Sequence, residues 1–110
     1  MKQWEIFLFP FREEQAHPAV ILSPDERCTN PDFDRVNALI CTSIRLNRPL
    51  KDNEAALDES DGLDWLTAVR CDVVHFLRKE FLLERRGLVS LPRRIAISRK
   101  LIHCLRLPTH

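Results

Sequence analysis

The chain has little glycine, no closely spaced pair of cysteines and no long apolar run. The last two of these features argue against a zinc site and a membrane segment. Its four cysteines are widely separated, so we expect reduced, mostly buried thiols and neither a zinc site nor another cofactor. The longest apolar runs, such as AVIL at 19–22, are far too short to cross a membrane. No charged-then-apolar signal segment precedes the first strand pattern. We therefore predict a cytoplasmic protein with no membrane segment.

The 110 residues suffice for one domain with one modest core, so 1–110 is predicted to be a single unit. A hydrophobic content of 45% with 30% charged residues is typical of a soluble globular protein. The charge, however, is divided unevenly. Residues 1–65 contain 7 Lys and Arg against 13 Asp and Glu, whereas residues 66–110 contain 10 against 3. The basic half either binds a polyanion or pairs with the acidic half of the same chain.

Five short segments have the composition of β-strands. WEIFLFPF (4–11) predicts a strand over about 4–9 that ends at Pro10. PAVILS (18–23) is a continuous apolar run, which is typical of a buried strand. The remaining strands are predicted at 35–44, 54–58 and 66–76. The segments 24–34 and 45–53 are predicted to be loops, and the turn at 60–62 contains a glycine.

The last third of the chain predicts helical structure. KEFLLERRG (79–87) predicts a helical turn closed by its glycine. Ser90 as N-cap and Pro92 in the first turn predict the start of a longer helix. Apolar residues recur along it at helical spacing: Leu91, Ile95, Leu101, Ile102 and Leu105. Five strands and a terminal helix favour a small antiparallel barrel over a βαβ fold, although Gly62 and Gly87 are few glycines for one.

The strand-like run TAVRCDVVH (67–75) carries an arginine and an aspartate two positions apart. Because side chains alternate between the two faces of a strand, Arg70 and Asp72 are predicted to share one face. Val69, Cys71 and Val73 then form the core face. A cation beside an anion in an otherwise apolar segment is either a structural ion pair or half of an active site.

Three stretches, in this order and at this spacing, resemble the MazF/PemK family of toxin endoribonucleases. They are REEQAHPAVILSP at 12–24, ICTS at 40–43 and AVRCD at 68–72. The family pattern runs through E-Q-x-G-x-R-P-A-V-V-L-S, then P-x-T-S, v-R-C-D and l-G-x-[LV]-s, before a C-terminal helix. The resemblance covers nearly the whole chain. It implies a homodimer of small SH3-like antiparallel barrels of the CcdB/MazF/PemK type, mainly β with a C-terminal helix.

The resemblance also implies the toxin of a toxin–antitoxin pair, which cleaves single-stranded RNA without a metal. In that reaction the 2′-hydroxyl attacks the adjacent phosphate, leaving a cyclic phosphate and a 5′-hydroxyl. Such chemistry needs a base near the 2′-hydroxyl, cations around the phosphoryl oxygens and a donor for the leaving oxygen. An extended segment of the cognate antitoxin peptide is expected to cover the RNA groove.

The PemK branch uses the arginine and aspartate of its R-C-D strand, so Arg70 and Asp72 inherit these catalytic roles. Asp72 is the natural base, but a neighbouring Arg70 is expected to lower the pKa of Asp72 when catalysis would need it raised. Arg70 keeps its proton at any working pH, so we assign it to clamp the phosphate. Thr42 matches the family threonine that bonds the scissile phosphate. Alternatively, Thr42 and Ser43 simply end a strand.

The chain departs from the family in its first loop. His17 stands where the MazF branch has an arginine, the loop is shorter and lacks its glycine, and Trp4 replaces a first-strand glycine. His17 either takes over proton transfer, since the unperturbed pKa of histidine suits it, or is an inert loop residue. Arg12 is a candidate to supply the missing positive charge to the substrate. Glu14 matches a family loop acid or is a solvated charge.

Several aromatic and histidine side chains have competing interpretations. Phe9, Phe11 and Trp65 either stack unpaired bases or, as is more common on strands, belong to the core. His75 and His103 have apolar neighbours in the sequence, and we interpret both as structural.

Two other functions remain open. The missing loop arginine motivates a binding module for RNA or protein on the same barrel, without catalysis. The structurally related CcdB poisons DNA gyrase through a C-terminal Trp-Gly-Ile, whereas this chain ends in LRLPTH, so this function ranks last. A ribonuclease site requires Arg70, Asp72, Thr42 and His17 to converge on one groove.

Overall fold

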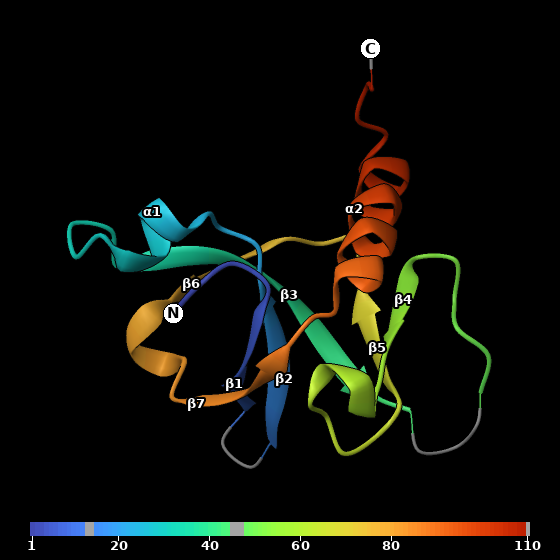
Figure 1. Cartoon of the computed structure of the whole chain (residues 1–110), viewed down its shortest axis with the longest axis horizontal. Helices are drawn as coiled ribbons and strands as arrows, with labels where there is room; N and C mark the ends of the chain where they lie inside the picture. Colours follow the sequence, from blue (N-terminus) through green and yellow to red (C-terminus); the bar gives the residue numbers. More distant parts are fainter. Residues whose placement is uncertain (13–14, 45–47, 110) are drawn as a thin grey trace.

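Seven strands form a bent, antiparallel half-barrel sheet, and a C-terminal helix packs against it (Figure 1). The computed structural model describes residues 1–12, 15–44 and 48–109. Its strands are β1 (Glu5–Arg12), β2 (Gln15–Ile21), β3 (Arg35–Ser43), β4 (Glu54–Leu57), β5 (Thr67–Arg70), β6 (His75–Arg78) and β7 (Glu84–Leu88). Its helices are α1 (Asp25–Thr29) and α2 (Leu91–Leu105), with 3₁₀ turns η1 (Glu59–Asp61) and η2 (Lys79–Phe81).

The strands follow the order β4-β5-β3-β2-β1-β7, and β6 also pairs with β3. Helix α2 stands over the β4–β5 end of the sheet, whereas α1 lies at the other end, near β6 (Figure 1). The predicted fold class, mainly antiparallel β with a C-terminal helix, is confirmed. The predicted number of strands is wrong, since seven are described instead of five. None of the described helices is long and apolar enough to cross a membrane.

The predicted strand at 66–76 is in fact two strands, β5 and β6, separated by residues 71–74. Both pair with β3: Cys41 lies opposite Val69, and Ala38 lies opposite His75. Cys41 and Ala38 are three residues apart on β3, whereas their partners Val69 and His75 are six residues apart. The segment between β5 and β6 therefore contains three extra residues. Such bulges re-aim side chains and are common beside active sites. This one places Asp72 outside the regular ladder.

The sheet buries apolar side chains on both of its faces. Alternate residues of β2 enter different core clusters, Val20 one and Ala19 and Ile21 the other. Ile97 of α2 belongs to the first cluster and Cys28 of α1 to the second. Burial on both faces explains why this strand is a continuous apolar run, and it confirms the predicted buried strand.

Two boundaries predicted around prolines and acidic residues are wrong. Pro10 does not end β1; it pairs with Ala16 beside a register shift, beyond the last residue of β1 that pairs with β7. Proline is tolerated there because the lost N–H faces no neighbouring strand. The predicted loop 24–34 contains the short helix α1, and β2 begins at Gln15, so His17 lies on a strand and not in a loop.

At both glycine positions neighbouring backbone atoms leave no room for a side chain. Gly62 has φ of 91° and closes η1, which confirms the predicted turn. The predicted helical turn at 79–87 is confirmed only for η2 at Lys79–Phe81; its closure at Gly87 is wrong, because Gly87 lies within β7. A Cβ on Gly87 would lie 2.0 Å from the backbone oxygen of Asp61. Trp4, at the family's glycine position, has φ of 71°, in the region that favours glycine.

Helix α2 starts after Ser90 with Pro92 in its first turn, as predicted. Its apolar residues form two stripes instead of one. Ile97 is fully buried, and Leu101 and Cys104 pack beside it against the first core cluster. Leu91 and Ile95 belong to the second stripe and are 69% and 55% exposed.

Candidate functional site

Arg70 and Asp72 form a bidentate ion pair at the bulge that follows β5. Nε of Arg70 donates to Oδ1 of Asp72 at 2.7 Å, and Nη2 donates to Oδ2 at 3.3 Å. The side chains are 58% and 30% exposed, so a ligand from solution can reach both. A guanidinium that presents paired N–H groups to a carboxylate is also suited to a phosphate.

Asp72 stays ionised far below neutral pH. The hydrogen bond from Arg70, followed by one from Asn53, lowers the pKa of Asp72 to about 2. The backbone oxygen of Asn53 also accepts the N–H of Cys71 at 2.8 Å, so Asn53 holds the bulge from the turn before β4. The expectation that Arg70 lowers this pKa is confirmed. A carboxylate with so low a pKa is a weak proton acceptor at neutral pH.

A second carboxylate faces Arg70 from the neighbouring strand. Glu54 pairs with Arg70 across the β4–β5 ladder and is almost buried. Arg48 binds it with two hydrogen bonds, of 2.8 and 2.9 Å. These bonds are the main reason why the pKa of Glu54 falls to about 2. Asn53 and Glu54 are absent from the sequence prediction because they approach Arg70 only through strand pairing.

Thr42 shares a face of the sheet with Arg70, whereas Ser43 does not. Thr42 pairs with Ala68, and Arg70 lies two residues further along β5 on the same side. Diagonal neighbours of this kind are roughly 7–8 Å apart, which is within reach of a long side chain. Thr42 is exposed. Ser43 pairs with Thr67, and alternation puts both on the opposite face.

His17 lies on β2, half-buried, and pairs with Phe9 of β1. The described pairing of β2 with β3 ends at Ala19 and Ile40. Continuing the same register by two residues leads to His17 on one strand and Thr42 on the other. His17 and Thr42 thus lie beyond the same end of the described β2–β3 ladder, each two residues past its last pair.

Two predicted substrate-binding residues lie partly or wholly outside the described structure. Arg12 ends β1 and pairs with Gln15, but its side chain is not among the described ones. Glu14 lies outside the described residues altogether. Their roles remain predictions.

The two histidines interpreted as structural have different surroundings. His75 is half-buried just after the bulge, and burial, followed by the charge of Arg70, lowers its pKa. His103 is exposed on α2, where it lines a cleft with the polar residues Asp52 and Asn53. The inference of apolar surroundings from sequence neighbours was therefore wrong for His103.

The aromatic candidates separate into core and surface. Phe9 packs against the second core cluster, with its ring centroid 6.4 Å from that of Phe81 in an edge-to-face arrangement. Trp65 is exposed in the turn before β5. The side chain of Phe11 is outside the described part of the chain.

Part of the charge asymmetry is resolved by pairing within the chain. Three arginines of the basic half bind acids of the acidic half: Arg85 with Glu5, Arg86 with Asp64, and Arg93 with Asp58 and Asp61. Over residues 1–12, 15–44 and 48–109, no group of three His, Cys, Asp or Glu side chains could hold a metal ion. Three cysteine thiols are buried and Cys104 is half-buried, all of them unbridged.

No protein family model and no curated protein sequence matches the chain. Solved structures do match it over almost its whole length. An endoribonuclease in complex with its cognate antitoxin from a Mycobacterial species is 23% identical, with a TM-score of 0.81 over 100% of this chain and 99% of that one. The Mycobacterium tuberculosis toxin MazF-mt6 is 18% identical, with a TM-score of 0.78 over 94% and 98%.

MazF in a MazE–MazF crystal from Deinococcus radiodurans is 18% identical, with a TM-score of 0.76 over 98% of this chain and 97% of that one. The chain thus has the fold of the MazF toxins.

Proposed function

We propose that the chain is the toxin of a toxin–antitoxin pair, an endoribonuclease that cleaves single-stranded RNA in the cytoplasm without a metal. One observation carries the proposal: on a MazF fold, the bulge after β5 presents an exposed arginine–aspartate pair on the face that also carries Thr42. Cations and hydroxyl donors at this spacing suit a phosphodiester whose charge increases during the reaction.

In the proposed reaction Arg70 binds a non-bridging oxygen of the scissile phosphate, and the Thr42 hydroxyl donates to the same group. Asp72 takes the proton of the attacking 2′-hydroxyl. The new bond from the 2′-oxygen to phosphorus gives a cyclic phosphate, and the 5′-oxygen leaves with a proton supplied by solvent or by His17. No metal is required for this step.

The low pKa of Asp72 in the free protein is compatible with this role because its largest cause is removable. A phosphate that draws the guanidinium of Arg70 away from Asp72 removes that hydrogen bond and adds a second negative charge. Both changes raise the pKa of the carboxyl. His17 is the alternative base, since it lies beyond the same end of the β2–β3 ladder as Thr42.

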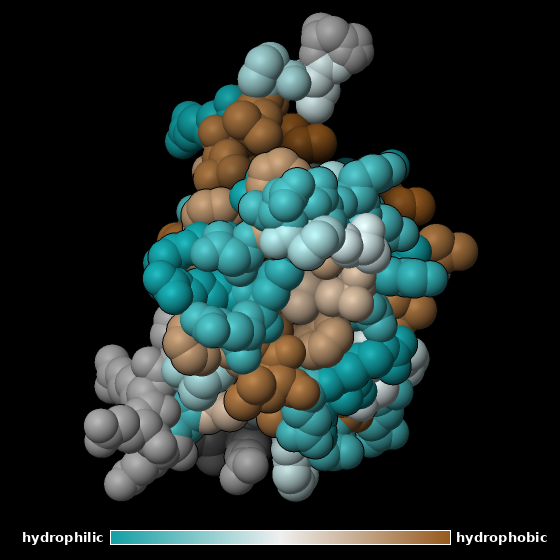
Figure 2. Space-filling view, turned by 90° about the vertical axis from the view of Figure 1, so that its left-hand side faces the viewer, coloured by the Kyte–Doolittle hydropathy of each residue, from teal (hydrophilic) through white to brown (hydrophobic). Residues whose placement is uncertain are grey.

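We also propose that the toxin is a homodimer through the exposed stripe of α2. A solvent-exposed apolar stripe along a helix marks an interaction surface. Leu91, Ile95 and Leu105 are the exposed large apolar residues of this helix. Figure 2 shows hydrophobic side chains gathered on the part of the molecule formed by the C-terminal end of α2.

The antitoxin is proposed as the second protein partner. One of the similar structures is an endoribonuclease in complex with its cognate antitoxin, and another is a MazE–MazF complex. An acidic peptide segment lying over Arg70 and Thr42 would block access of RNA to both.

Cleavage of a long, mostly single-stranded RNA in EDTA tests the proposed activity, with the wild type compared with Asp72→Ala. We expect the wild type to leave 5′-hydroxyl ends, and the variant to cleave at least 100-fold more slowly, as is usual for loss of a general base (~10²–10⁴-fold). Arg78→Gln on β6, which removes a paired arginine away from the bulge, should cleave like the wild type.

The second candidate is a binding module without catalysis, and the tight Arg70–Asp72 pair with its low pKa favours it. It would bind RNA while neither wild type nor variant cleaves. Equal cleavage by wild type and Asp72→Ala would instead exclude Asp72 as the base.

A further inference from the structure

The last turns of α2 carry cations that the fold does not use. The helix contains no Asp or Glu. Earlier in it, Arg93 pairs with acids, and Nε of Arg94 donates to the backbone oxygen of Val89. Within the described residues, Arg99, Lys100 and Arg106 form no ion pair. Lys79, on η2, also forms no described ion pair, but it donates to the backbone oxygens of Arg27 and Asn30. The cations of the basic half with neither kind of described partner are thus gathered at the C-terminal end of α2.

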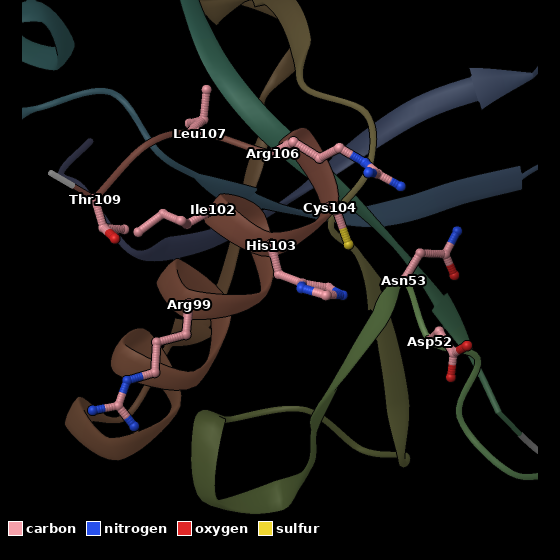
Figure 3. Close-up of a pocket in the computed structure, with 9 residues that line it drawn as sticks. All are labelled: Asp52, Asn53, Arg99, Ile102, His103, Cys104, Arg106, Leu107 and Thr109. Atoms are coloured by element: carbon pink, nitrogen blue, oxygen red, sulfur yellow. The ribbon is translucent and has the colours of Figure 1, made fainter.

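A cleft of about 660 Å³ runs beside these turns (Figure 3). Helix α2 and the residues after it provide Arg99, His103, Arg106 and Thr109, and the turn before β4 provides Asn53. The side chains of His103 and Arg106 extend toward the wall that carries Asn53 (Figure 3). Asp52 is the one acid among the lining residues.

The cleft and the candidate active site share one residue, Asn53. Asn53 lines the cleft and also hydrogen-bonds Asp72, while its backbone oxygen accepts the N–H of Cys71. A ligand that leaves the Arg70–Asp72 pair on this side reaches a cleft whose polar lining is two arginines, His103, Asn53, Thr109 and one acid, Asp52, beside the apolar side chains of Ile102 and Leu107 and the thiol of Cys104.

We propose that this cleft binds the backbone phosphates of the RNA that flanks the scissile bond. The inference rests on the proposed ribonuclease function and adds a subsite to it. Arginine and histidine side chains, with Asn and Thr as neutral donors, are the groups that contact phosphates without reading sequence. The subsite therefore contributes affinity for long substrates and no base preference.

The salt dependence of RNA binding measures this subsite directly. The probe is a labelled, mixed-sequence single-stranded oligonucleotide with 2′-O-methyl groups, which lacks the attacking hydroxyl. Its dissociation constant is measured by fluorescence anisotropy across a salt series for the wild type and for Arg99→Gln/Arg106→Gln. We expect the slope of log affinity against log salt to become shallower by about 1.4, which is ~0.7 for each phosphate that is no longer neutralised.

The matched control is Arg78→Gln/Arg85→Gln, which removes the same charge from β6 and β7. Its slope should equal that of the wild type. A cation that only complements the negative end of the helix dipole would change the melting temperature but not the slope. Thermal melts of both double variants establish that they are folded.

Two results would overturn the inference while leaving the proposed function in place. One is an unchanged slope in Arg99→Gln/Arg106→Gln when the wild type cleaves long RNA in EDTA. The other is an unchanged slope with weakened binding of a poly-glutamate peptide, which would assign the cleft to an acidic protein segment. A wild type that neither binds the probe nor cleaves RNA would instead remove the proposed function itself.

Discussion

Asp72 illustrates how a residue found in the sequence acquires its chemistry from neighbours that the sequence does not reveal. Arg70 and Asp72 could be paired from local spacing alone, because they are only two residues apart, although β5 ends at Arg70 and Asp72 lies in the bulge and not on the strand. Asn53 and Glu54 could not, since they meet Arg70 and Asp72 only when the turn before β4 docks beside β5. The lowered pKa of Asp72 was predictable in direction because its main cause, Arg70, is local.

The pH dependence of cleavage should identify the base. With the pKa of Asp72 at about 2 in the free protein, kcat/KM should be flat from about pH 5 to 8, because this quantity reports the free enzyme. The acid limb of kcat should lie at higher pH than that of kcat/KM, since bound phosphate competes for Arg70 and raises the pKa of Asp72. Both profiles are obtained from initial rates on a fluorogenic RNA.

An imidazole base would behave differently. The value of kcat/KM would then fall toward the acid end of this pH range instead of staying flat. If that fall is observed and disappears in His17→Gln, the proton acceptor is His17 and not Asp72.

The strands and helices that could be predicted are those whose sequence of apolar and polar residues follows from which of their faces are buried. β2 and β3 are apolar on both faces because α1 and α2 cover opposite sides of the sheet. The break between β5 and β6 was hidden, because TAVRCDVVHF is uniformly strand-like and the three extra residues arise only from its register on β3. The segment of β7 was predicted to end a helix because a glycine after a polar stretch is typical of a C-cap. In the structure Gly87 instead allows the close approach of the Asp61 backbone.

Arg93 should be the main link between α2 and the β4 end of the sheet. Its guanidinium donates to the backbone oxygen of Ala56 at 2.6 Å and to Asp58 at 2.9 Å, and it lies 3.4 Å from buried Asp61. We expect Arg93→Met to lower the free energy of unfolding by about 3 kcal/mol, because it leaves a buried carboxylate without its cation. Urea unfolding at neutral pH measures the change.

The neighbouring Arg94→Met provides the control. The guanidinium of Arg94 bonds only the backbone oxygen of Val89 among the described contacts, so its loss should cost less than half as much. Equal destabilisation by the two substitutions would show that general loss of charge on the helix, and not the link through Arg93, is responsible.

In the part of the chain that the structure describes, α2 has a face that the sheet does not cover. A chain of this size buries a limited fraction of its apolar surface, and large exposed side chains that gather on one element are typical of an interface. Leu91 and Ile95 lie on the side of α2 away from Ile97, and they are shielded from water only if a second molecule covers them.

Leu91→Glu/Ile95→Glu should therefore convert the proposed dimer to monomers. Burying two carboxylates in an apolar interface costs more than a small dimer gains from that contact. The measurement is sedimentation equilibrium over a concentration series, together with cleavage of long RNA. Leu83→Glu is the control: Leu83 is 77% exposed on the connection between η2 and β7, and a charge there should leave the dimer intact. A wild type that stays monomeric at every concentration, or a Leu83 variant that dissociates equally, would rule out the α2 stripe as the interface.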